Sequence, residues 1–257
     1  MKKLILAVLA LGILGSGTYL VHEYWQQQKL EGPDAPDSIL LEDLLEGKKS
    51  IDDLPRVQEE LPTSINIDLP FYTQAPYSNW DYPWQEACEE ASVLLVANVH
   101  KGLNLDREAY NTELLRLIDW EIGYFGAYEH TTVAQTAEMI KIQYGLETVI
   151  HDHPTFEDFQ EILADGHLII APFAGKYLGN PNYLNGGPIY HMMVVKGYDA
   201  EKMQIVTHDV GTRNGADYVY DWAVIENALH DWNNTDMLKG TPRIIEVLPG
   251  IKLFGPP

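Results

Sequence analysis

The chain has 257 residues, of which 38 are acidic and 17 are basic, so its formal net charge at pH 7 is -21. This excess of carboxylates repels phosphate backbones, which argues against nucleic acid as a partner. Cys88 is the single cysteine, which excludes an intramolecular disulfide and a cysteine-rich zinc or iron–sulfur site. The apolar content of 46% is typical of a globular protein.

The first predicted element, over residues 1–25, is a signal peptide or signal anchor. Two lysines precede an uncharged run from Leu4 to His22, similar in length to the ~20 residues that span a bilayer. Cleavage near the small residues 15–17 and retention as an anchor both remain open. The aromatic pair at residues 24–25 favours the anchor. The remainder is therefore predicted to be extracytoplasmic, either secreted or anchored to the plasma membrane.

An acidic linker is predicted over residues 26–63. It contains four prolines, and an amphipathic stretch at residues 38–45 indicates one short helix. We interpret the linker as a solvated spacer, and a propeptide covering an active site is the alternative. One compact domain is predicted to follow over residues 64–257.

Within this domain, helices dominate the first half and strands the second. Capping residues indicate where helices begin, as at Asp106 and Thr155, and glycines indicate where two of them end. Helices are predicted at 87–100, 106–120, 131–144 and 155–166, and strands at 65–69, 146–150, 168–173, 192–198, 203–207, 218–220 and 243–247. The segregation predicts an α+β fold, with an N-terminal helical half packed on a C-terminal antiparallel sheet.

Cys88 stands at the start of the predicted helix 87–100. Free N–H groups and the positive partial charge at a helix start favour the nucleophilic thiolate. Glu86, Glu89 and Glu90 act in the opposite direction, because nearby negative charge raises the pKa of a thiol. An imidazolium partner would be needed to overcome them. A buried structural cysteine is the alternative, but a free thiol is a liability in an exported protein, so we favour a nucleophile.

His191 precedes the predicted strand 192–198, and Asp209 follows the next strand. A turn at residues 199–202 would bring both side chains to one end of a hairpin. A three-residue loop places Asp209 opposite His191, whereas a four-residue loop places His208 on that face. We prefer Asp209, because a carboxylate on the second ring nitrogen would fix the tautomer and stabilise the imidazolium.

The order of these motifs resembles a known family of enzymes. The motifs are Phe71-Tyr72-Thr73-Gln74, the Cys88 helix, residues 190–199 beginning Tyr190-His191-Met192, and His208-Asp209-Val210-Gly211-Thr212. They resemble the papain-like cysteine peptidases related to bacteriocin-processing, double-glycine-leader peptidases, and more closely their exported, stand-alone bacterial relatives. The resemblance spans residues 65–247.

The resemblance implies a papain-like fold and hydrolysis of peptide bonds in a peptide or protein substrate, without a cofactor. It implies that Cys88 is the nucleophile, His191 the general base and Asp209 the orienting carboxylate. Gln74 matches the glutamine that helps form the oxyanion hole, and Gln85 is the alternative for that role.

The family often has glycine after the nucleophile, whereas this chain has Cys88-Glu89-Glu90. A glutamate at this position crowds the site, so two other functions stay open. One is a catalytically inactive cell-surface member that binds peptides. The other is an amide hydrolase or transferase acting on cell-wall peptides.

Other patterns are weaker. The aromatic residues Trp80 and Trp84, together with Tyr190, are candidates for the wall of a substrate cleft, although core packing is nearly as good an explanation. The Gly- and Asn-rich loop 176–188 is predicted to border that cleft. The pair in His151-Asp152-His153 lacks a third ligand at a suitable spacing, so we predict no metal site. Nothing in the sequence indicates an oligomeric state.

Overall fold

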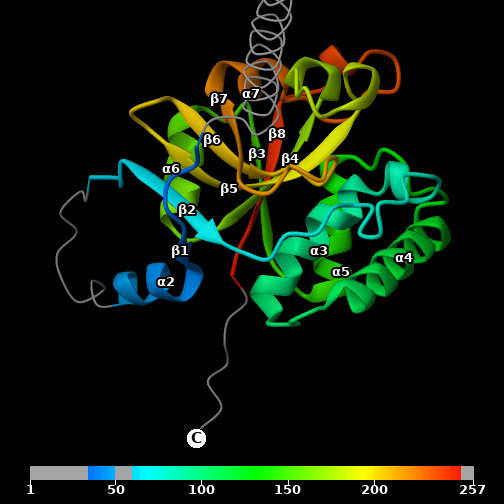
Figure 1. The fold of residues 1–257 in the computed structure, drawn as a ribbon, viewed down its shortest axis with the longest axis horizontal. Helices are drawn as coiled ribbons and strands as arrows, with labels where there is room; N and C mark the ends of the chain where they lie inside the picture. Colours follow the sequence, from blue (N-terminus) through cyan, green and yellow to red (C-terminus); the bar gives the residue numbers. More distant parts are fainter. Residues whose placement is uncertain (1–33, 50–59, 250–257) are drawn as a thin grey trace, which may run out of the picture. The chain divides into compact units, whose positions relative to one another are not determined.

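A largely antiparallel sheet organises the part of the chain that the computed structural model describes, residues 34–49 and 60–249 (Figure 1). Its strands are β1 (Ile39–Leu40), β2 (Ser64–Asp68), β3 (Thr148–Asp152), β4 (Leu168–Phe173), β5 (His191–Asp199), β6 (Gln204–His208), β7 (Tyr218–Asp221) and β8 (Arg243–Val247). The strand order is β1-β2-β5-β4-β8-β3, while β6 pairs with β5 and β7. Every pairing is antiparallel except β1 with β2.

The helices are α2 (Leu41–Lys49), α3 (Cys88–Lys101), α4 (Arg107–Tyr124), α5 (Val133–Tyr144), α6 (Phe156–Ala164) and α7 (Trp222–Ala228). Side-chain caps fix the starts of three of them. Asp106 accepts the N–H of Ala109, and Thr132 and Thr155 each form a complete capping box. Gly145 ends α5 in the left-handed conformation that glycine adopts readily.

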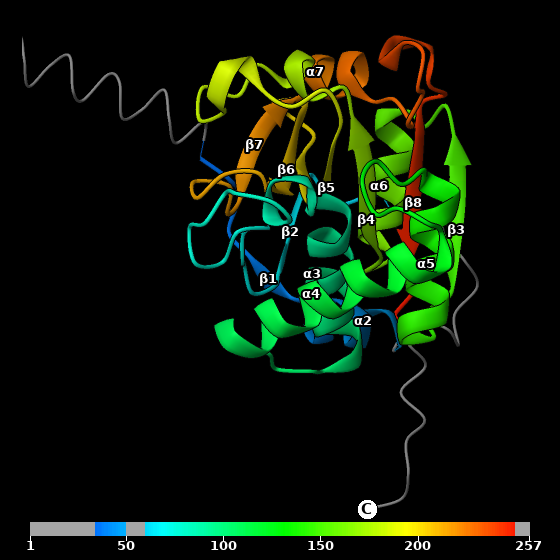
Figure 2. The ribbon, with the colours of Figure 1, turned by 90° about the vertical axis from the view of Figure 1, so that its right-hand side faces the viewer.

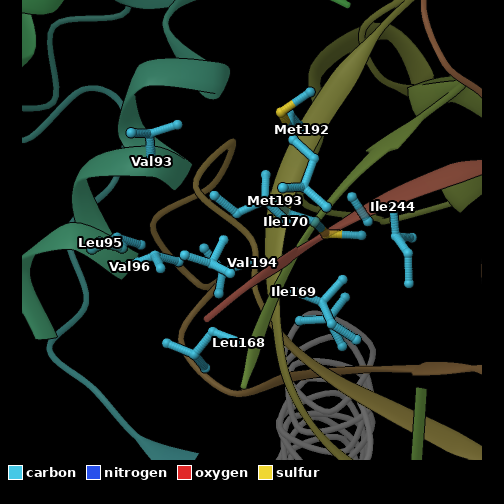
Figure 3. Packing of buried hydrophobic residues seen from close by; sticks show 14 of the residues in the cluster. Val93, Leu95, Val96, Leu168, Ile169, Ile170, Met192, Met193, Val194 and Ile244 are labelled. Atoms are coloured by element: carbon cyan, nitrogen blue, oxygen red, sulfur yellow. The ribbon is translucent and has the colours of Figure 1, made fainter. Parts of the chain in front are cut away.

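Two helices cover the centre of the sheet. Figures 1 and 2 show α3, α4 and α5 grouped together beside the sheet, and α3 contacts β4 and β5. The helix α6 contacts the same two strands, and every residue of β4 is buried. Because side chains alternate between the faces of a strand, such burial requires cover on both faces. Val96 of α3 faces Val194 of β5 in this core (Figure 3), which fixes α3 against the strand that begins at His191.

The predicted fold class is confirmed, and strands 168–173 and 243–247 have the predicted bounds. The helix α7 is absent from the sequence prediction. It begins at Trp222, directly after β7 ends at Asp221, and Asp221 makes no side-chain cap. Aspartate is a common N-cap residue, but here it forms no capping hydrogen bond, and the helix has only seven residues.

Part of the predicted linker packs on the domain. Ile39 pairs with Ile67 of β2, Leu41 is buried, and Pro36 O accepts a hydrogen bond from Asn66 Nδ2 at 2.9 Å. The predicted solvated spacer therefore does not include Ile39 and Leu40, because these two residues add a short strand to the edge of the sheet. The expected short helix is observed as α2.

The predicted targeting segment, residues 1–25, lies outside the described residues. Within the ranges 34–49 and 60–249, no helix combines the length and apolarity needed to span a membrane.

Candidate active site

A β-bulge decides which residue at the end of β6 faces His191. The strands β5 and β6 are joined by the four residues 200–203, and such a loop alone would place His208 on the face of His191. However, the register shifts at Lys196. Because a shift of one residue turns every later side chain to the other face, Asp209 takes that position instead.

Buried contacts hold the bulge in place. The Lys196 ammonium, which is 1% exposed, donates to Asn66 Oδ1 at 2.8 Å and also pairs with Asp217. At Gly197, a Cβ atom would lie only 2.2 Å from the carbonyl oxygen of Ile65, so a larger residue cannot fit without moving β2. The close approach of β2 to Gly197 and the ion pair of Lys196 therefore stabilise the strand register in which Asp209 lies on the face of His191.

His191 and Asp209 form a direct, buried hydrogen bond. His191 Nε2 lies 2.8 Å from Asp209 Oδ1, and both side chains are almost completely shielded from solvent. The ionised carboxylate only accepts hydrogen bonds, so Nε2 carries a proton in this pair. This leaves Nδ1 as the ring nitrogen that can act as a base.

Asp209 is held by four further donors. Its Oδ1 accepts the N–H of Gly211 at 3.0 Å. Its Oδ2 accepts from Asn180 Nδ2 at 3.0 Å and from the hydroxyls of Tyr183 and Tyr220, both at 2.6 Å. Burial acts to raise the pKa of Asp209, but the adjacent imidazole and the tyrosine hydroxyls outweigh it and lower that pKa. The surroundings therefore keep this carboxylate ionised beside His191.

These additional donors are absent from the sequence prediction. Asn180 and Tyr183 belong to the loop 176–188, which was predicted only to border the cleft, and Tyr220 lies in a predicted strand. Composition showed a polar, aromatic loop, but only the folded chain shows that its side chains converge on Asp209.

Cys88 is the first residue of α3 and lies beside the start of β5. Its Sγ accepts the backbone N–H of Met192, the residue after His191, at a distance of 3.4 Å. Ser92 Oγ bridges the two elements through the carbonyl oxygens of Cys88, at 2.7 Å, and Met192, at 3.2 Å. The structure thus brings the thiol to the strand that carries His191, although no hydrogen bond joins Sγ to the imidazole among the described residues.

The thiol also contacts the next residue of α3. Cys88 Sγ lies 3.0 Å from Glu89 Oε2, and Glu89 Oε1 accepts the N–H of Thr131 at 3.1 Å. Burial raises the pKa of Cys88 well above its ordinary value, and the charges of Glu89 and Glu90 add to this effect. The favourable helix start therefore does not by itself generate a thiolate.

Gln74 is hydrogen-bonded to the turn that leads into Cys88. Its backbone N–H donates to Val210 O at 3.0 Å, which ties it to the loop after Asp209. Its side-chain Nε2 donates to the carbonyl oxygens of Trp84 and Gln85, both at 2.9 Å. These two bonds use both N–H groups of the Gln74 amide. One of them would have to break before Gln74 could donate a hydrogen bond to an oxyanion. The Gln85 side chain is exposed, and the choice between the two glutamines stays a prediction.

The predicted cleft residues occupy different environments. Trp84 is half-buried and donates from Nε1 to Asn111 Oδ1 at 2.9 Å, and Trp80 is also half-buried. Tyr190 is buried, and its hydroxyl donates to Thr131 O at 2.9 Å. This contact links Tyr190 to the segment that also binds Glu89, and a role of the three aromatic residues in substrate binding stays a prediction.

One histidine of the pair discounted as a metal site is bonded to a glutamate. His151 Nε2 lies 2.6 Å from Glu246 Oε2, and Asp152 pairs with Arg243 at 2.8 Å. Across the described ranges, no group of three or more His, Cys, Asp or Glu residues has an arrangement that could hold a metal ion.

Gly211→Ala is expected to slow alkylation of Cys88 by iodoacetamide about 10- to 100-fold, because a small displacement of His191 would impair transfer of the thiol proton to its ring. A Cβ at this position would lie 2.8 Å from His191 Cε1 and 3.3 Å from Asp209 Oδ1. The matched control is Gly123→Ala in α4, whose Cβ would meet nothing within 4 Å. Equal alkylation rates in both variants would show that the position of His191 does not influence the thiol.

Comparisons with known proteins identify the family of the chain. The model of the Peptidase_C39 like family matches residues 66–239. Among solved structures, a protein described as a C39-like peptidase from Bacillus anthracis has 13% identity and a TM-score of 0.48, and the match covers 75% of this chain and 98% of that one.

Xylellain, a cysteine protease from Xylella fastidiosa, also has 13% identity, with a TM-score of 0.36 and coverage of 85% of this chain and 96% of that one. No curated protein matches the chain. The family match covers more than half of the chain and includes Gln74, Cys88, His191 and Asp209. The chain therefore belongs to the Peptidase_C39 like family and is a cysteine peptidase at the level of that family.

Proposed function

We propose that the protein hydrolyses peptide bonds through a triad of Cys88, His191 and Asp209. The observation that carries this proposal is the buried His191–Asp209 hydrogen bond of 2.8 Å beside a thiol that accepts the Met192 N–H. A carboxylate on Nε2 fixes the tautomer in which Nδ1 is a base, and it stabilises the imidazolium that forms when the thiol loses its proton.

The proposed reaction moves one proton through His191. The imidazole takes the thiol proton, and Cys88 Sγ attacks the peptide carbonyl carbon to form a tetrahedral intermediate. The free backbone N–H groups at the start of α3 and the Gln74 amide would stabilise its oxyanion, and loss of one such donor typically costs about 10²- to 10³-fold in rate. The imidazolium then protonates the leaving amine, and water releases the acyl group.

We also propose that this reaction takes place outside the cytoplasm. The support is the sequence of residues 1–25, in which two lysines precede an uncharged run of membrane-spanning length. The segment is either cleaved, which gives a secreted peptidase, or retained as an anchor in the plasma membrane.

One observation favours a non-hydrolytic alternative. The raised pKa of Cys88 and its contact with Glu89 oppose the thiolate, which fits a member that binds peptides without cleaving them. The two functions differ in one measurable result: a peptidase cleaves peptides in a reaction that requires the Cys88 thiol, whereas a binding protein does not cleave them.

Alkylation of Cys88 tests the triad without a known substrate. The His191→Ala variant is expected to react with iodoacetamide at pH 6 about 10²-fold more slowly than the unaltered protein, because it has no base for the thiol proton. The control is His153→Asn, a change at an exposed histidine with φ of 53°. Asparagine tolerates this left-handed conformation, so the backbone should be unchanged. Equal labelling of the His191→Ala variant and this control would contradict the triad.

A further inference from the structure

Three carboxyl groups are buried behind the nucleophile. Glu89 and Glu90 follow Cys88 on α3, Glu121 lies on α4, and none of them is more than 1% exposed. No lysine, arginine or histidine forms an ion pair with any of the three in the described ranges, and the carboxyl groups of Glu90 and Glu121 have no hydrogen-bond partner there other than each other. Buried charges without a counter-ion are strongly unfavourable, so these groups hold protons near neutral pH.

Glu89 differs from the other two because it contacts the reacting atom. Its Oε2 lies 3.0 Å from Cys88 Sγ. Its Oε1 accepts the Thr131 N–H at 3.1 Å, which prevents the carboxyl group from rotating away. The side chain therefore has one oxygen committed to the backbone and one directed at the thiol.

We propose that Glu89 is a catalytic residue, a neutral carboxylic acid whose O–H donates a hydrogen bond to the Cys88 thiolate during the reaction. This inference rests on the proposed peptidase function and names a further group that it requires. A thiolate and a carboxylate 3.0 Å apart in a dry site would repel each other strongly. The reactive thiolate can therefore form only while Glu89 keeps its proton.

Burial is the largest influence on the protonation of Glu89. It raises the pKa of Glu89 well above its ordinary value, and Glu90 and Glu86 raise it further, whereas the hydrogen bond with Cys88 and a backbone hydrogen bond act to lower it without outweighing burial. Glu121 on α4 is itself raised to a pKa of about 8, chiefly by burial, and Tyr190 before β5 has a raised pKa. None of these neighbours is a cation, so none of them would draw the proton away from Glu89.

The protons balance at each step. In the resting state Cys88 is a thiol, His191 is neutral and Glu89 is an acid. The S–H proton moves to His191 Nδ1, and the Glu89 O–H then points at the thiolate and remains bonded to its own oxygen. When Sγ forms its bond to the carbonyl carbon, the sulfur loses its charge and Glu89 is still an acid. No oxidant, reductant or added proton is needed.

The test is the pH dependence of iodoacetamide alkylation in Glu89→Gln and Glu89→Ala. Glutamine keeps a donor for the thiolate and an acceptor for the Thr131 N–H, but it cannot ionise. Its alkylation rate should match the unaltered protein at pH 5 and exceed it about tenfold at high pH, where Glu89 has lost its proton. Alanine has no donor, so its rate at pH 6 should fall about 10- to 100-fold.

The control is Glu157→Gln, which makes the same charge change at an exposed position on α6 and should follow the unaltered protein. A Glu89→Gln profile parallel to the unaltered protein at every pH would overturn the proposal. So would a Glu89→Ala variant that reacts at least as fast at pH 6, because Glu89 would then only suppress the nucleophile. If Glu89→Ala does not fold, the glutamine profile decides alone.

Peptide hydrolysis is measured on the same variants. The expected alkylation profiles without cleavage of any peptide would support the role of Glu89 at the thiol and contradict the proposed function. Cleavage together with parallel alkylation profiles would support the function and overturn the role of Glu89.

Discussion

Cys88→Ala is expected to abolish peptide hydrolysis, a loss on the order of 10⁴-fold or more, because removal of a nucleophile leaves only binding and oxyanion stabilisation. Cys88 is the only cysteine of the chain, so no other thiol can replace it. The small side chain should be accommodated, because it removes only the contacts of Sγ with Glu89 and the Met192 N–H.

The measurement is digestion of a peptide library by the unaltered protein and by the variant, with products identified by mass spectrometry. Cys88→Ser is the matched variant, because its hydroxyl can still bond to Glu89 and accept the Met192 N–H while being a much weaker nucleophile. Full hydrolysis by Cys88→Ala would refute the nucleophile assignment. Absence of cleavage by the unaltered protein would favour the peptide-binding alternative, and cleavage confined to cell-wall peptides would favour the amide hydrolase or transferase.

Local signals were sufficient for most of the fold. The capping residue at Asp106 and the capping box at Thr155 are contacts between residues close in the chain, and the structure shows both. The strand 168–173 is an apolar run, and the strand 243–247 has β-branched residues at three of its five positions, so both are marked by local composition. By contrast, α7 is only seven residues long, and Asp221 at its N-cap position makes no capping hydrogen bond, so the local signal for this helix is weak.

The site depends on contacts between distant residues, which sequence patterns do not encode. Loop length alone would have placed His208 on the face of His191, and the bulge that reverses this is held by the contact of Lys196 with Asn66, 130 positions away. In the sequence, Asp209 is preferred only because a carboxylate suits a partner of His191. In the structure, the shifted register of β5 and β6 accounts for its position. The contact of Glu89 with the thiol required the Thr131 segment, which positions its other oxygen.

Asp209→Asn is expected to lower peptide hydrolysis about 10²- to 10⁴-fold and the free energy of unfolding by about 2–5 kcal/mol. All five partners of this carboxylate are donors, three on Oδ2 and two on Oδ1. In either orientation of an asparagine amide, its NH₂ group would face at least two of these donors. Those buried donors would then have no acceptor. The neutral amide also stabilises the imidazolium of His191 less than a carboxylate does.

The pH dependence of the free energy of unfolding distinguishes loss of the ionised carboxylate from a general destabilisation caused by the substitution. The pKa of Asp209 is lowered in the folded protein, so its ionised form contributes stability above the unfolded pKa of about 3.9 and loses it as the pH falls through the folded pKa. Urea denaturation should therefore show the largest difference between Asp209→Asn and the unaltered protein near pH 7, narrowing below about pH 4. The control, Asp152→Asn, removes an exposed pair with Arg243 and should cost at most about 1 kcal/mol. A difference of the same size at pH 7 and pH 3 would show that Asp209 is not held as a carboxylate, and His191 would then lack the counter-charge on which the proposed triad depends.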